Sequence, residues 1–176
     1  MLKKAYVAIS LIFVVIVMSL IACSPSEKKD FLPYQDGLFE STATLLINSK
    51  KYTVDIIKNN ENGYRISFSS PENMQGVCID KDGDNYTYSV GSVHIPIKAG
   101  SNLASESFKL LQLSKESLVS SESALLNGVK VEIKRFKTED QSVTLYLSED
   151  TKLPLRIEAD LGGNDVVLSF SKFEIK

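Results

Sequence analysis

Cys23 is the residue whose surroundings point to a specific chemical reaction. It ends a Leu-Ile-Ala-Cys stretch at 20–23, and the chain before it has Lys3 and Lys4 followed by a mostly apolar run over 5–21. This order of basic, apolar and small residues is typical of a secretory signal. The small alanine before the cysteine suits a peptidase, and the freed cysteine thiol can carry a diacylglycerol as a thioether. We therefore expect residues 1–22 to be a lipoprotein signal peptide and Cys23 to be lipidated.

An uncleaved transmembrane anchor is the alternative interpretation of the same residues. The apolar run over 5–21 is slightly shorter than the roughly 20 residues that a spanning helix needs. In either case the rest of the chain would lie at the extracytoplasmic face of the cell membrane. Lipidation would hold it there durably, because acyl chains such as palmitate contribute about 0.8 kcal/mol per buried methylene.

Catalytic chemistry has little support in the remaining residues. His94 is the only histidine, and it alternates with Val93 and Ile95, so we expect it on the polar face of a strand. A Ser-His-Asp or Cys-His site would need this histidine together with a third, orienting group, and no signature loop supplies one. The acidic segment 80–84 has glycine at its fourth place, where a calcium loop would need it at the sixth. We expect no enzyme, no metal site and no cofactor.

Composition limits the classes of partner. The 176 residues carry a formal charge of −2, and removing residues 1–22 takes away two lysines and no acid, which leaves about −4. A nucleic-acid surface would need clustered lysine and arginine, so we expect no nucleic acid among the partners of this mildly acidic chain. The 154 residues that remain are enough for one domain with a real core.

The mature chain begins as a polar, proline-interrupted stretch that we interpret as a tether over 23–35. From 36 onward the dominant period is two. In 39–47 the odd positions Phe39, Ala43, Leu45 and Ile47 share one face, as in a half-buried strand. Further strands are expected over 52–57, 64–68, 76–80, 86–90, 93–97, 124–126, 129–133, 143–147, 155–159 and 166–170, and the last could extend through 175.

The period changes between Leu103 and Val119, where Phe108, Leu110, Leu111, Leu113 and Leu118 are spaced more like a helix. A two-stranded arrangement of part of this segment is the alternative. With the helix, the pattern predicts an α+β fold: a curled antiparallel sheet of about ten strands, an incomplete barrel, packed around one or two helices.

Two short motifs resemble a known family. The segment Asp150–Glu158 contains threonine, any residue, leucine and proline at 151–154, a step found in the lipoprotein-carrier superfamily of LolA, LolB and their relatives. The segment 70–77 is similar to lipoproteins of low-GC Gram-positive bacteria, and clostridial germination lipoproteins are among the candidate relatives. The resemblance implies that residues 36–176 form a LolA/LolB-like β-rich domain.

In this family an incomplete barrel encloses an apolar cavity that accepts acyl chains or, in some members, a protein partner. The resemblance implies a cavity lined by Leu45, Ile47, Val54, Ile56, Ile66 and Phe68. These residues could equally fill an ordinary core. Two functions follow: a membrane-anchored, non-catalytic module that binds an envelope protein, which we favour, and a carrier or receptor for lipid or lipoprotein acyl chains. An open cavity would support the carrier, and a filled core with exposed apolar or edge-strand patches the binding module.

Overall fold

The computed structural model describes residues 31–98, 107–138 and 141–176. Residues Leu32–Lys176 form one folded unit, and the predicted signal peptide and Cys23 lie outside the described residues. The strands are β1 (Phe39–Ile47), β2 (Lys50–Lys58), β3 (Gly63–Ser70), β4 (Val77–Asp82), β5 (Asn85–Val90), β6 (Val93–Ile97), β7 (Leu118–Leu126), β8 (Val129–Lys137), β9 (Gln141–Ser148), β10 (Pro154–Leu161) and β11 (Asp165–Ile175). The helical segments are α2 (Pro33–Asp36) and the 3-10 turns η1 (Glu72–Met74), η2 (Phe108–Leu111) and η3 (Lys115–Ser117).

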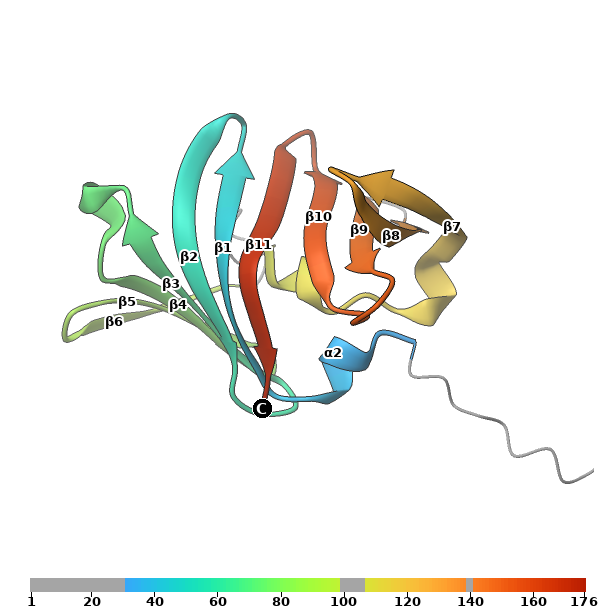
Figure 1. Ribbon diagram of the computed structural model, residues 1–176. Coiled ribbons are helices and arrows are strands. Elements are labelled where there is room, and N and C mark those ends of the chain that lie inside the picture. Colours follow the sequence, from blue (N-terminus) through green and yellow to red (C-terminus); the bar gives the residue numbers. More distant parts are fainter. Residues whose placement is uncertain (1–30, 99–106, 139–140) are drawn as a thin grey trace, which may run out of the picture. The chain divides into compact units, whose positions relative to one another are not determined.

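All eleven strands belong to one antiparallel sheet, in the order β6-β5-β4-β3-β2-β1-β11-β10-β9-β8-β7 (Figure 1). Two meanders, β1 to β6 and β7 to β11, are joined where β1 pairs with β11. In that pairing Phe39 lies opposite Ile175, and Leu45 lies opposite Leu168. The two ends of the folded unit therefore meet in the middle of the sheet, and β6 and β7 are its outer strands.

Hairpin turns set the register of neighbouring strands. Asn127 and Gly128 have φ angles of 51° and 82°, the backbone of a type I′ turn, whose twist matches that of the flanking strands. Asn48 and Ser49, with φ angles of 45° and 69°, form a similar two-residue turn between β1 and β2. Both turns lie between strands that the sequence predicts, over 39–47 and 52–57 and over 124–126 and 129–133.

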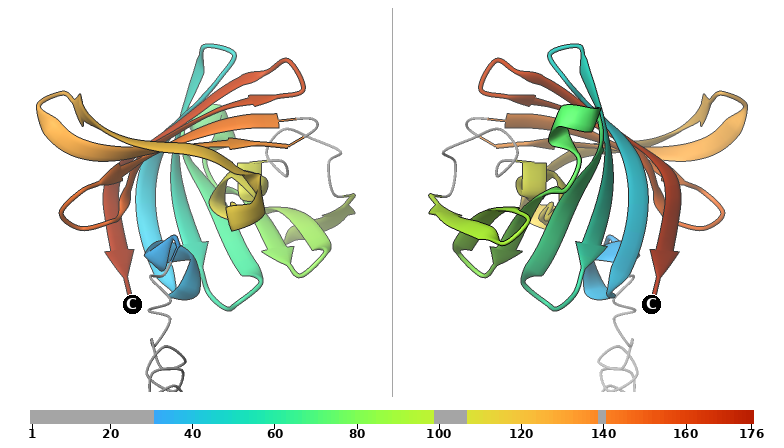
Figure 2. Two further views of the ribbon diagram at one scale, coloured as in Figure 1. Left: turned by 90° about the vertical axis from the view of Figure 1, so that its right-hand side faces the viewer. Right: turned by 90° about the vertical axis from the view of Figure 1, so that its left-hand side faces the viewer.

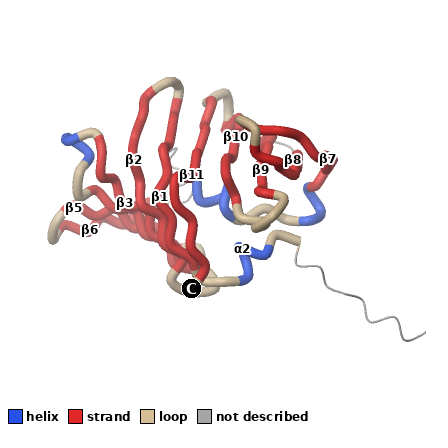
Figure 3. The backbone as a smooth tube through the Cα atoms, in the orientation of Figure 1, coloured by secondary structure: helices blue, strands red, loops and turns tan. Residues whose placement is uncertain are grey.

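The predicted helix near residues 103–119 is wrong for the part that the structure describes. Phe108–Leu111 and Lys115–Ser117 are short 3-10 turns, and β7 already begins at Leu118. Three of the four residues in η2, Phe108, Leu110 and Leu111, are fully buried. This single turn therefore buries three of the five apolar side chains that suggested a longer helix, and the other two, Leu113 and Leu118, are half-buried. The described fold is therefore nearly all-β, which gives the predicted α+β class only weak support, while the predicted number of about ten strands agrees with the open, eleven-stranded sheet (Figure 3).

The core lies between one face of the sheet and the segments α2 and η2. Figure 2 shows the sheet curving around these segments. Phe39, Leu45, Val54 and Ile56 from β1 and β2 are at most 1% exposed. Their side chains lie on the same, inner face of the sheet, because residues directly opposite each other on neighbouring strands share a face. The odd positions of β1 are buried as the alternation predicts, except that Ile47 is half-buried.

Candidate functional site

The six residues predicted to line a cavity come from three adjacent strands. Val54 pairs with Ala43 on one side and with Phe68 on the other, and Ile56 pairs with Ile66, so these side chains share the inner face of the sheet. Five of the six are buried, and Ile47 is half-buried. The structure thus brings the predicted set together; its role in binding a ligand stays a prediction.

Aromatic side chains from α2 and η2 pack over this inner face. Tyr34 of α2 and Phe108 of η2 are completely buried. Ring centroids lie 6.4 Å apart for Tyr34 and Phe39, and 6.1 Å apart for Tyr64 and Phe108. Phe108 also contacts Tyr86 of β5 at 6.0 Å. One η2 ring therefore bridges β3 and β5, and this part of the inner face is filled by the protein's own side chains.

Two lysines lie among these rings, in a row across neighbouring strands. Tyr64 pairs with Lys58 on β2 and with Lys81 on β4, and each lysine Nζ is 5.9 Å from the centroid of the Tyr64 ring. Lys58 is only 4% exposed, and its Nζ donates a hydrogen bond to the backbone carbonyl of Gln35. The lysine row therefore stabilises the inner face through cation–π contacts. Strand parity could have predicted it, because Lys58 follows Val54 and Ile56 at even spacing.

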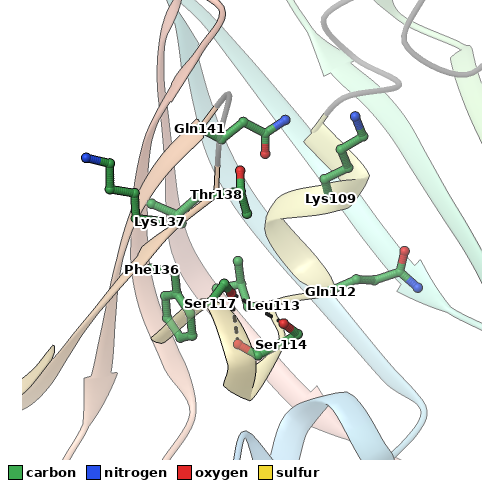
Figure 4. Close-up of a pocket in the computed structure, with 10 residues that line it drawn as sticks. Lys109, Gln112, Leu113, Ser114, Ser117, Phe136, Lys137, Thr138 and Gln141 are labelled. Carbon is green, nitrogen blue, oxygen red and sulfur yellow. Dashed lines mark hydrogen bonds between the residues drawn. The ribbon is translucent and has the colours of Figure 1, made fainter. Parts of the chain in front are cut away.

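A pocket of about 310 Å³ lies beside this filled region, between the η2–η3 segment and strands β8 and β9 (Figure 4). Leu113, Phe136 and Val143 supply apolar surface, and serine, threonine, glutamine and lysine side chains supply polar groups. Small-molecule pockets usually enclose roughly 300–1,000 Å³, so this pocket is at the lower end of that range. None of the six predicted cavity residues is among those that line it.

His94 takes part in a hydrogen bond that the sequence does not reveal. Its Nδ1 lies 2.8 Å from the Oγ of Ser89, its pairing partner on β5. A Ser-His nucleophile also needs a third group that orients the histidine, and among the described residues no carboxylate contacts His94. Ser89 is only 7% exposed. The pair is therefore a cross-strand contact to which no third, orienting carboxylate is joined within the described ranges.

Within the described ranges, no group of three or more potential ligand side chains could hold a metal ion. The same ranges contain no helix that is long and apolar enough to cross a membrane. Cys78 is a free, half-buried cysteine, and its Sγ lies 3.4 Å from the Oγ of Ser67.

Exposed apolar side chains concentrate at the two outer hairpins of the sheet. Of the eight large apolar side chains exposed in the described residues, six belong to these hairpins: Val90, Val93 and Ile95 at β5–β6, and Val119, Leu125 and Val129 at β7–β8. Leu125 is the most exposed of all, at 71%. Apolar side chains on an outer strand next to unpaired backbone groups are typical of a surface that binds another chain. Sequence patterning alone did not single out these two hairpins.

No family model and no curated protein matches the sequence. Solved structures do share the fold. An uncharacterized conserved protein from Thermus thermophilus is similar with a TM-score of 0.55 and 12% identity, over 82% of this chain and 82% of that chain. At such low identity the likeness shows the fold alone.

Two further structures are more distant. A LolA superfamily protein from Nitrosomonas europaea has a TM-score of 0.44 and 10% identity, over 82% of this chain and 91% of that chain. A chain of the Pseudomonas aeruginosa MucA/MucB complex has a TM-score of 0.46 and 14% identity, over 81% of this chain and 53% of that chain. A LolA superfamily member is thus among the structural matches. The resemblance to Gram-positive and clostridial lipoproteins stays a prediction.

Proposed function

We propose that this protein is a non-catalytic binding module, held at the extracytoplasmic face of the cell membrane by a lipid on Cys23, that binds another protein of the cell envelope. One observation carries the proposal: the part of the inner face around η2 is filled by the protein's own side chains, whereas apolar side chains are exposed at the two outer hairpins. Phe108 is fully buried against the inner face, while Val93 and Leu125 on the outer strands are 57% and 71% exposed. A surface of this kind gains free energy by burying apolar area against a partner.

The chemistry of the described side chains favours binding over catalysis. The Ser89–His94 pair lacks a carboxylate within the described part of the chain. The lysines of the inner face contact aromatic rings and act there as structural groups. We infer that the protein acts by holding a partner near the membrane.

Lipid anchoring is the second part of the proposal, and it rests on the sequence around Cys23. A Cys23→Ala variant should lose the diacylglycerol and leave the membrane fraction or remain unprocessed. A variant that stays in the membrane with a shortened, cleaved chain would contradict lipid anchoring. The matched Cys78→Ala variant, which removes the half-buried cysteine of β4, should stay anchored.

A carrier or receptor for acyl chains is the second candidate, and the pocket beside η2 favours it. Leu113, Phe136 and Val143 offer apolar walls, and Lys109 and Lys137 contribute positive charge among the lining residues. A lipid with an anionic headgroup matches such a lining in chemistry. The volume of about 310 Å³ is small for long acyl chains, so we rank this function below partner binding.

Photo-crosslinking in living cells tests the partner-binding proposal. A benzophenone amino acid would replace Val93 on β6 or Leu125 on β7 in the full chain, and Lys51, an exposed residue in the middle of the sheet, would serve as the matched control. We expect an adduct of one defined protein mass from an outer-strand position and none from Lys51. Equal labelling at all three positions, or adducts with lipid alone, would contradict the proposal.

A further inference from the structure

The two outer strands of the sheet differ in how much of their backbone is open to a partner. Gly91 and Ser92 form the two-residue turn between Val90 and Val93, which pair with each other. In such a hairpin the pair that flanks the turn is hydrogen-bonded, and hydrogen-bonded and non-bonded pairs then alternate along the ladder. His94 and Pro96 are therefore the β6 residues whose backbone groups face away from β5.

Pro96 removes a donor from that outer side. Proline has no N–H, so the short strand β6, which spans Val93–Ile97, presents only the N–H of His94 and the carbonyls of His94 and Pro96. Because Pro96 occupies a non-bonded position, it costs the β5–β6 ladder no hydrogen bond. Proline on an outer strand is a known way to block the addition of another strand.

Strand β7 has no such protection. Leu126 and Val129 flank the Asn127-Gly128 turn and pair with each other. The same alternation turns the backbone N–H and C=O groups of three residues away from β8: Leu125, Ser123 and Ser121. Strand β7 spans nine residues and contains neither proline nor lysine. Among the described strands, β7 pairs only with β8.

The side chains of β7 leave these backbone groups accessible. Residues 119–123 are all exposed, and three of them are serines with small side chains. Figure 1 places β7 at the end of the sheet opposite to β6. An extended segment that pairs with β7 would gain up to six backbone hydrogen bonds to Leu125, Ser123 and Ser121. It would also cover Leu125, the most exposed large apolar side chain in the described residues.

Charge adds a second requirement for the partner. Glu122 is the only charged residue of β7. Its Oε1 forms an ion pair with Nη2 of Arg135 at 2.7 Å, yet the Glu122 side chain remains 53% exposed. Leu125 and Glu122 are three positions apart and point to opposite faces of the sheet. A segment paired with β7 would therefore meet them with residues three positions apart: an apolar one beside Leu125 and a basic one beside Glu122.

We propose that β7 is the docking edge, where the partner protein adds an extended strand that carries an apolar and a basic residue three positions apart. This rests on the proposed binding function and gives it a site and a recognition chemistry. Affinity comes mainly from main-chain hydrogen bonds, and specificity comes from Leu125 and Glu122.

The test uses the full, lipidated chain in detergent and a labelled peptide, acetyl-Thr-Val-Thr-Thr-Arg-Thr-Thr-amide, whose one valine and one arginine are three positions apart. Binding is followed by fluorescence anisotropy. Ser123→Pro removes an outward N–H, whereas Ser123→Ala keeps the backbone donor and removes only the hydroxyl. We expect wild type and Ser123→Ala to bind alike and Ser123→Pro to bind at least tenfold more weakly. Leu125→Lys, which places a charge on the edge and leaves the backbone unchanged, should weaken binding in the same direction if Ser123→Pro fails to fold.

A peptide methylated at the nitrogens that would face β7 serves as the matched probe, because it keeps every side chain and loses those donors. Equal binding of the methylated and unmethylated peptides, full binding by Ser123→Pro, or no binding by wild type would overturn the proposal. A dimer of this chain that dissociates in Ser123→Pro, without peptide binding, would overturn it in favour of a second copy as the occupant. If crosslinks to a protein in cells persist in a folded Ser123→Pro variant, the binding function stands and only the assignment to β7 fails.

Discussion

Gln35 and Leu111, 76 residues apart in the chain, are joined by a hydrogen bond in which the Gln35 Nε2 donates to the Leu111 backbone carbonyl at 3.0 Å. This bond connects α2 with η2, the two segments that cover the inner face of the sheet. The neighbouring Tyr34 is fully buried, and this burial raises the pKa of Tyr34 far above its usual range. The bond from Gln35 therefore helps to hold α2 against η2.

Gln35→Met should lower the free energy of unfolding by about 1 kcal/mol, because it removes the donor and leaves the Leu111 carbonyl without this bond. Urea unfolding of the full chain measures the change. Gln75→Met, the same substitution at an exposed glutamine, is the matched control and should have almost no effect. Equal losses in the two variants would show that the bond does not stabilise the fold.

Leu111→Ala and Leu125→Ala compare the same substitution at a buried and at an exposed position. Leu111 is completely buried and Leu125 is 71% exposed. We expect Leu111→Ala to lower the free energy of unfolding by about 2–5 kcal/mol, since it leaves a cavity, and Leu125→Ala to change it by less than about 0.5 kcal/mol. A small loss for Leu111→Ala would mean that η2 does not seal the inner face.

Gly128→Ala should destabilise the β7–β8 hairpin. The φ angle of Gly128 is 82°, a region that costs an L-residue with a side chain roughly 1–2 kcal/mol, and nothing else lies within 4 Å of the position that a Cβ would take. The loss would therefore report backbone strain alone. Asn127→Gly, which keeps the positive φ accessible, should be nearly neutral. A Gly128→Ala variant as stable as wild type in urea would refute the type I′ turn.

Glu132 should make stability depend on pH. Burial opposes its ionisation, but the hydrogen bond from Ser121 at 2.8 Å and the charges of Lys134 and Lys152 outweigh burial and lower the pKa of Glu132. A lowered pKa in the folded state adds stability above the unfolded pKa of about 4.3, and this stability is lost as pH falls through the folded pKa.

Glu132→Gln should therefore unfold at a lower urea concentration than wild type at pH 7. This gap between the two urea midpoints should shrink as the pH falls to about 3. Ser121→Ala should show the same trend with a smaller gap, because it removes only one of the groups that lower this pKa. A gap of constant size over that range would contradict the role given to Glu132.

Local sequence patterns predicted much of this fold but not its assembly. The alternation around Leu45 and the Asn127-Gly128 turn fix strands and hairpins through nearest-neighbour physics. The pairing of β1 with β11 joins residues more than a hundred positions apart, and no local pattern encodes that register. Phe108 and its neighbours suggested a helix, because clustered apolar residues suit both a longer helix and a single 3-10 turn. In the structure this cluster forms the short turn η2, which packs against Tyr64 and Tyr86.

The candidate site was predicted only in part. The alternation of side chains along each strand placed Val54 and its neighbours on one face of the sheet, as found. It could not tell whether that face is covered by other side chains or open to solvent. The exposure of the outer hairpins depends on the strand order, which places β6 and β7 at the two ends of the sheet.

Native mass spectrometry of the full chain, extracted with mild detergent from membranes of the organism that encodes it, tests the central claim most directly. The claim is that the protein binds a protein partner and does not carry acyl chains in its interior. We expect a complex with one other protein at a fixed ratio, which a Leu125→Lys substitution weakens, and no lipid beyond the anchor on Cys23. A chain without a protein partner that retains one fatty acid or phospholipid per molecule would contradict the claim and favour the carrier.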